Sequence, residues 1–121
     1  MSVKSADTIA QLGNVVWLEA CGGALCDAGV AQLGRMTQLT YLSLAQNPAI
    51  TDVSYGVLEQ LRSLQSLNVS GTGMSSPDAR FVAQMPHLVS FSMYGLPLNE
   101  GFGRSVVAAH PGVKFVGAAV R

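Results

Sequence analysis

The chain has 121 residues and no net formal charge, and charged residues make up only 12% of it, about half of the usual quarter in a soluble domain. This length fits one domain with a continuous core, and so few Lys and Arg residues argue against binding to nucleic acid or an anionic membrane. Hydrophobic residues reach 49%, but no unbroken apolar stretch approaches the roughly 20 residues that would span a bilayer.

The N-terminal segment lacks the features of an export signal. Residues 1–14 contain one lysine followed by an aspartate, and no apolar core of signal-peptide length. We therefore expect a cytoplasmic, intracellular protein. Residues 5–12 resemble half of a helix, and we expect residues 1–14 to form a helical cap. Cys21 and Cys26 show neither a disulfide framework nor a C-x-x-C metal spacing, so we expect reduced thiols and no cofactor.

An apolar pattern, L-x-x-L-x-L, recurs every 24 or 25 residues from residue 15 onward. The five copies are Val15-Leu18-Ala20, Leu39-Leu42-Leu44, Leu64-Leu67-Val69, Leu88-Phe91-Met93 and Val113-Val116-Ala118. A repeat of this period is typical of a solenoid, in which each turn buries its apolar side only against the neighbouring turns.

Each copy predicts a strand, a turn and a returning helix. The last two apolar positions are two residues apart, so both point inward from a strand, and Gly, Asn or Pro then ends that strand. The next inward residues are expected to be Leu25, Ile50, Met74 and Leu98, followed by helix caps at Cys26, Thr51, Ser75 and Asn99. Apolar residues at helical spacing come next, beginning with Val30, Leu33 and Met36.

These features resemble the leucine-rich repeat family. Residues 39–63, LTYLSLAQNPAITDVSYGVLEQLRS, are most similar to its cysteine-containing and ribonuclease-inhibitor-like subclasses, whose repeats carry an ITD step before the helix. The asparagine of the family's turn is present only as Asn47, and Gly23, Thr72 and Leu96 occupy the nearest equivalent positions.

The resemblance implies an α/β fold, a right-handed β-α solenoid with a parallel concave sheet and convex helices. We expect one domain over residues 1–121. Its expected divisions are the cap at 1–14, repeats at 15–38, 39–63, 64–87 and 88–112, and a terminal strand at 113–121.

The residues between the inward leucines should point outward and form a surface that we call the concave face. The repeat register predicts three columns on it: Trp17, Tyr41, Ser66, Ser90 and Phe115; then Glu19, Ser43, Asn68, Ser92 and Gly117; then Cys21, Ala45, Ser70, Tyr94 and Ala119. Glu19 is the only charged residue among them.

This face predicts a protein-binding site. Large, stiff aromatic side chains often dominate binding energy, and the serines and Asn68 could satisfy a partner's backbone. The candidate contact residues are Trp17, Glu19, Tyr41, Ser43, Ser66, Asn68, Ser90, Ser92, Tyr94 and Phe115. The alternative is that the aromatic residues pack among themselves or against a terminal extension.

The last strand offers a second possible interface. Residues 113–120 form a fifth strand without a returning helix in this sequence, and an exposed edge strand can pair with another chain. The strand could instead be a sufficient cap, or the chain a fragment of a longer one. We therefore expect a noncatalytic interaction module, with self-association through this edge possible; a structural subunit of a large assembly is the alternative.

Catalysis and metal binding are not indicated. His87 and His110 each lie beside a proline, and His110 falls in the register of buried methionines, so a structural role is expected. Neither cysteine has a histidine nearby in the repeat register to activate it. Asp27 and Asp52 occupy equivalent positions at helix N-termini, where the helix dipole explains them.

Overall fold

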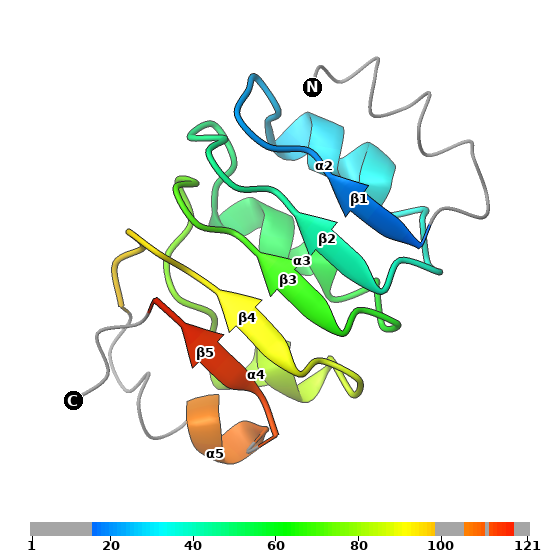
Figure 1. Ribbon diagram of the computed structural model, residues 1–121, viewed down its shortest axis with the longest axis vertical. Helices are drawn as coiled ribbons and strands as arrows, with labels where there is room; N and C mark the ends of the chain where they lie inside the picture. The colour runs from blue at the N-terminus through cyan, green and yellow to red at the C-terminus, as the bar shows by residue number, and fades with distance from the viewer. Residues whose placement is uncertain (1–15, 99–105, 111, 118–121) are drawn as a thin grey trace.

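A computed structural model describes residues 16–98, 106–110 and 112–117, and it confirms the predicted α/β solenoid (Figure 1). Five strands form one parallel sheet in the order of the sequence, and the helices lie against one face of this sheet. The strands are β1 Trp17–Glu19, β2 Tyr41–Ser43, β3 Ser66–Asn68, β4 Ser90–Ser92 and β5 Lys114–Val116. The helices are α2 Asp27–Leu33, η1 Asp52–Ser54, α3 Tyr55–Leu58, α4 Ala79–Ala83 and α5 Val107–Ala109. The predicted N-terminal cap, the Asn99 cap and Ala119 lie outside the described residues.

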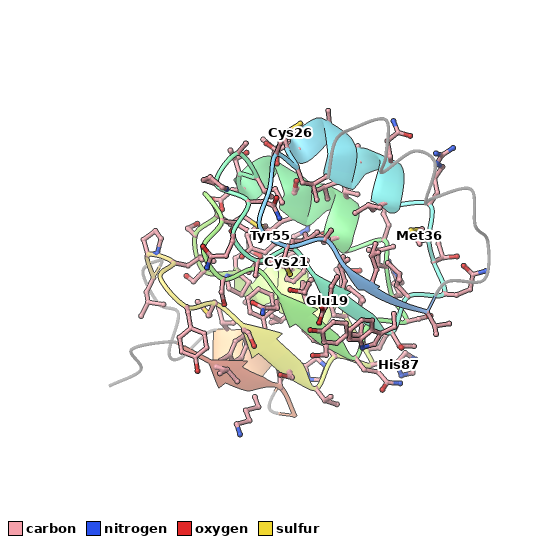
Figure 2. All side chains as sticks on the ribbon, turned by 45° about the horizontal axis from the view of Figure 1, so that its top comes forward. Glu19, Cys21, Cys26, Met36, Tyr55 and His87 are labelled. Carbon is pink, nitrogen blue, oxygen red and sulfur yellow. The ribbon has the colours of Figure 1, made fainter. Side chains whose placement is uncertain are left out.

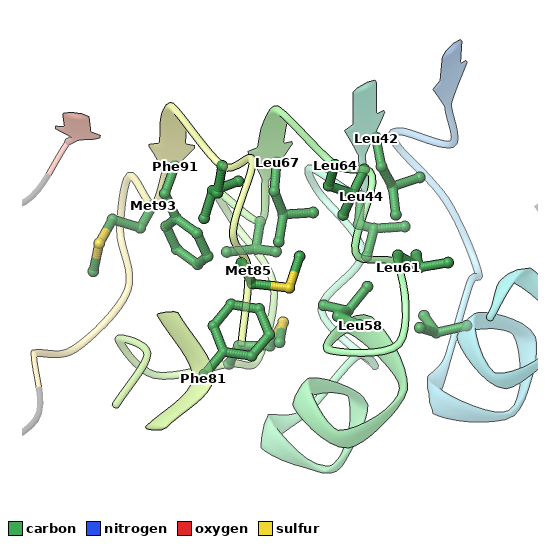
Figure 3. Packing of buried hydrophobic residues seen from close by; sticks show 14 of the residues in the cluster. Leu42, Leu44, Leu58, Leu61, Leu64, Leu67, Phe81, Met85, Phe91 and Met93 are labelled. Atoms are coloured by element: carbon green, nitrogen blue, oxygen red, sulfur yellow. The ribbon is translucent and has the colours of Figure 1, made fainter. Parts of the chain in front are cut away.

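The core is a stack of leucine layers, one from each turn of the chain. In the second and third turns every ladder residue is fully buried. Figure 3 shows four of them pointing from the strand side toward the helices: Leu42, Leu44, Leu64 and Leu67. The buried ladder residues of these turns are Leu39, Leu42, Leu44, Leu64, Leu67 and Val69. Toward the C-terminal end aromatic rings replace leucines: the Phe81 and Phe91 ring centroids lie 6.2 Å apart. Each layer covers the next, so the apolar surface is buried between turns.

Asn47 ties the first two turns together from a fully buried position. Its side-chain amide donates to the carbonyl oxygens of Ala20 and Leu44 at 2.7 and 2.8 Å. Its Oδ1 accepts from the backbone N–H groups of Gly23 and Leu25 at 3.1 and 3.2 Å. One side chain therefore satisfies backbone groups that the turn would otherwise bury without partners.

Two aspartates connect successive turns on the helical side. Asp27 accepts hydrogen bonds from the backbone N–H and the hydroxyl of Thr51, 24 residues further along the chain, and from the Ser54 hydroxyl. Asp52 accepts the equivalent pair from Ser75, at 2.6 and 2.7 Å. The helix dipole alone does not explain these carboxylates, because each one binds the start of the next turn.

The environment of Asp27 shifts its ionisation. Burial raises the pKa of this carboxyl, but the hydrogen bonds from Ser54 and Thr51 outweigh burial and hold the pKa below its usual value of 3.8. The charged form is therefore the one that the folded chain stabilises.

Two details of the third and fourth turns differ from the sequence prediction. Helix α4 begins at Ala79 and is capped by Asp78, which accepts from the Phe81 N–H at 2.8 Å; Ser75, predicted as the cap, instead donates to Asp52. Leu98, predicted to point inward, is 40% exposed, whereas Leu96, at the position equivalent to Asn47, is buried.

The register of the fifth strand also differs from the prediction. Phe115 pairs with Phe91 at an inward position, which places Lys114 opposite Ser90 and Val116 opposite Ser92. The Phe115 ring lies against the core, with its centroid 5.9 Å from that of Phe91. The prediction that Phe115 faces outward is therefore wrong, because burying a phenylalanine ring removes more apolar surface from water than burying a valine.

Substitution of Asn47 by alanine should destabilise the fold strongly. It removes the partner of the buried Leu25 N–H, the buried Ala20 and Leu44 carbonyls and the part-buried Gly23 N–H, and we expect the free energy of unfolding to fall by about 2–4 kcal/mol. Chemical denaturation would measure it. Asn68→Ala is the matched control, since Asn68 is half-exposed and its loss should cost about 1 kcal/mol or less. Equal losses in the two variants would contradict this account of Asn47.

Acid should weaken the Asp27 connection. Because the folded-state pKa lies below the unfolded value, its stabilising contribution is complete above about pH 4 and is lost as the pH falls through the folded-state pKa. We expect Asp27→Asn to unfold at a lower temperature than the wild type at pH 7, with the difference shrinking toward pH 2. Melting curves between pH 2 and 7 test this, and a difference that is constant with pH would refute it.

Candidate functional site

The strands present two outward columns whose register the sheet fixes. The first column is Trp17, Tyr41, Ser66, Ser90 and Lys114. The second column is Glu19, Ser43, Asn68, Ser92 and Val116. Beyond the strand ends, Cys21, Ala45, Ser70 and Tyr94 continue the surface. Every predicted contact residue except Phe115 thus belongs to the concave face.

An aromatic stack occupies the β1 end of this face. The Trp17 and Tyr41 rings lie nearly parallel, with centroids 4.6 Å apart and an interplanar angle of 12°. Trp17 is 56% exposed although it is a large apolar side chain. The stack supports one face of the indole, so Trp17 offers a partner a rigid aromatic surface.

A polar cluster lies next to the stack. The Tyr41 hydroxyl interacts with the side chains of Glu19 and Ser43, and the Cys21 Sγ lies 3.1 Å from the Ser43 Oγ. Burial raises the pKa of Tyr41 above its usual value of 10.0, and the charge of Glu19 raises it further, so this hydroxyl is a neutral hydrogen-bond donor at pH 7. Ser43 is only 2% exposed, so it supports the cluster and does not reach solvent.

The centre of the face is lined by small polar side chains. Four small polar side chains lie here between the aromatic residues at the two ends, and all are half-buried: Ser66, Asn68, Ser90 and Ser92. Asn68 accepts a hydrogen bond from the Ser70 N–H at 3.0 Å. The centre can therefore offer hydroxyl and amide groups to a partner without a large apolar contact.

The β5 end combines an aromatic ring with a cation. Tyr94 is 58% exposed, and its ring lies directly over Gly117, whose backbone φ is +84°. A side chain at Gly117 would meet the Tyr94 ring within 2.6 Å, so glycine there permits this ring position. Lys114 is exposed in the first column. Sequence reasoning missed Lys114, because it assigned the outward position to Phe115.

The remaining reactive side chains are dispersed. Figure 2 shows Cys26 beside helix α2 and His87 far from it, on the opposite side of the molecule. His110 is half-buried and its Nε2 lies 3.0 Å from the Met85 carbonyl oxygen, which fits a structural role. Among the described residues, no group of three or more His, Cys, Asp or Glu side chains could hold a metal ion. No helix within the described ranges is long and apolar enough to cross a membrane.

One hollow lies on the helical side, away from the concave face. It has a volume of about 270 Å³ and is lined by residues of η1, α3, α4 and the loop before α4. Tyr55 reaches into this region from α3, and its hydroxyl donates to the Ser75 carbonyl oxygen at 2.6 Å. Burial and the charges of Asp52 and Asp78 raise the pKa of Tyr55, so it stays protonated. No sequence pattern predicts this hollow, because its lining comes from two adjacent turns.

Comparison with known proteins identifies the repeat. The leucine rich repeat family matches residues 21–74 of the chain. Residues 21–74 therefore resemble the leucine-rich repeat family in sequence, and the fold is a leucine-rich repeat solenoid. The solved structure of a tropomodulin C-terminal domain from Caenorhabditis elegans superimposes with a TM-score of 0.70 and 17% identity, covering 98% of this chain and 83% of that one. An internalin from Listeria monocytogenes gives a TM-score of 0.62 with 16% identity, covering 95% of this chain and 38% of that one.

This chain covers only a small part of the length of its sequence relatives. Leucine-rich repeat-containing protein 42 is 37% identical in the human form and 35% in the rat form, over 52% of this chain. The chain spans 17% of the length of these relatives. The structural likenesses establish the fold alone at such low identity, and the leucine-rich repeat family generally serves protein–protein interaction. The two subclasses named from the sequence remain a prediction.

The stability of two variants tests the register of β5. Phe115→Ala removes a ring packed on the core, and we expect the free energy of unfolding to fall by about 2 kcal/mol. Lys114→Ala, one residue away on the exposed face, should change it by less than about 0.5 kcal/mol. Chemical denaturation of both variants makes the measurement. No loss for Phe115→Ala would restore the register expected from the sequence, in which Phe115 faces outward.

Proposed function

We propose that this chain is a noncatalytic module that holds a protein partner on its concave face. The observation that carries the proposal is the exposed Trp17 ring, backed by Tyr41 at 4.6 Å. A rigid aromatic surface loses little conformational freedom on binding, and such a residue contributes on the order of 2 kcal/mol or more when a partner excludes water from it.

The rest of the face supports a protein partner. Its centre offers serine hydroxyls and the Asn68 amide, which match the hydrogen-bonding groups of a polypeptide. The face carries only one acidic and one basic residue among its described positions, so it lacks the cluster of cations that a phosphate backbone requires. Both cysteines are free, which supports a cytoplasmic location.

Strand β5 favours a second candidate interface. It is the last strand of the sheet and pairs with β4 on one side, so within the described residues its other edge is open to strand pairing. Self-association through this edge, or permanent incorporation into a larger assembly, is the alternative function. A concentration-dependent mass in analytical ultracentrifugation would favour that alternative over a monomeric recognition module.

The concave site is tested by capturing partners from a native cell extract on immobilised protein. We expect a specific partner to bind the wild type and to be lost from a Trp17→Ser, Tyr41→Ser double variant, because both rings lie outside the leucine core. Quantitative mass spectrometry of the bound proteins gives the measurement.

The matched control is Val53→Ser. Val53 is 74% exposed on the helical side, so its substitution removes exposed apolar surface away from the concave face. This variant should retain the partner, and unfolding curves should show that both variants are folded. Retention of the partner by the folded double variant would exclude the concave face and direct attention to the edge of β5.

A further inference from the structure

We propose that the concave face binds its partner segment in one direction only, with a basic residue at Trp17 and Glu19 and an acidic residue at Lys114. This inference rests on the proposed function and adds the chemistry of the partner. The two charges lie at opposite ends of the face, on β1 and β5.

The β1 end has the two groups that recognise an arginine or lysine side chain. Trp17 and Glu19 are two residues apart on one strand, so both point outward, and both are exposed. A cation over the Trp17 ring is attracted to its electron-rich face, and the carboxylate of Glu19 beside it supplies the opposite charge. Arginine suits such a site best, because its planar group can stack on the indole and hydrogen-bond to the carboxylate together.

The β5 end has the opposite charge because of the register of that strand. Lys114 belongs to the same outward column as Trp17, four strands away, and it is exposed. Four strand spacings of about 4.8 Å separate the two ends by about 19 Å. Tyr94 on the neighbouring turn adds an exposed ring near this end.

The centre between these ends carries no charge. Ser66, Ser90, Asn68 and Ser92 are neutral and half-buried, so the face has a negative end, a neutral middle and a positive end. A segment bound in reverse would place its acidic residue against Glu19 and its basic residue against Lys114. Like charges in contact across an interface select against that orientation.

The separation of the two charges predicts their spacing in the partner. A distance of about 19 Å corresponds to about six residues of an extended segment, at roughly 3.3 Å per residue. It corresponds to about 13 residues of a helix, at roughly 1.5 Å per residue. The partner segment should carry its basic and acidic residues at one of these spacings, with uncharged residues between them.

The experiment is a selection from a random 16-residue peptide library displayed on phage, performed on the purified full chain. It compares the wild type with Glu19→Lys, with Lys114→Glu and with the double variant that carries both changes. Glu59→Lys and Arg62→Glu are the control variants, because they reverse charges on the helical side. Enriched peptides are then synthesised and titrated in solution, with the fluorescence of Trp17, the only tryptophan of the chain, as the readout.

We expect the wild type and both controls to enrich peptides with a basic residue at one end and an acidic residue at the other. Glu19→Lys should lose the preference for the basic residue, and Lys114→Glu the preference for the acidic one. The double variant, whose charges are exchanged, should keep the preference for one basic and one acidic end, because such a peptide can turn end to end on the face. Titration of a wild-type peptide should show a change in Trp17 fluorescence and binding about tenfold weaker to each single variant.

The inference is overturned if either single variant, Glu19→Lys or Lys114→Glu, enriches the same peptides as the wild type, or if no peptide is enriched. Peptides that change Trp17 fluorescence but show no charge preference would overturn the polarity and leave the proposed function standing. Failure of the proposed function itself appears separately, as retention of the captured partner by the Trp17→Ser, Tyr41→Ser variant.

Discussion

Each turn of this solenoid buries its apolar residues only against the turns beside it, and the other features of the structure depend on that constraint. The fully buried leucines of β2 and β3 form layers that neither turn could cover alone. Because contacts join neighbouring turns, the strands must align in register, and this alignment sets the outward side chains side by side.

Polar groups reinforce this stacking at different places in the turn. Asn47 satisfies backbone groups of two turns from within the core, whereas Asp27 and Asp52 bind the start of the next turn near the surface. A buried amide keeps its hydrogen bonds at any pH, but a carboxylate keeps them only while it is ionised. The solenoid thus combines connections of different pH sensitivity.

The concave face owes its properties to the rigidity of the sheet beneath it. A parallel ladder places Trp17 against Tyr41, and the same ladder sets Glu19 and Lys114 at opposite ends of a neutral surface. In the proposed complex the aromatic rings would provide binding energy, and the separated charges would set the direction of the partner. A flexible loop carrying the same residues would hold neither arrangement.

The sequence alone determined the repeat, the inward leucines and the neighbouring positions of Trp17 and Tyr41, because these follow from a period of 24 or 25 residues and the alternation of a strand. The parallel stacking of the two rings was decided by the tertiary structure. Only the tertiary structure decided between Phe115 and Val116 for the last inward position, since packing against Phe91 selects the larger ring. It also decided the burial of Ser43, which depends on side chains of neighbouring strands. Periodicity specifies which residues are equivalent, whereas competition between side chains for the same space is settled only when the turns pack.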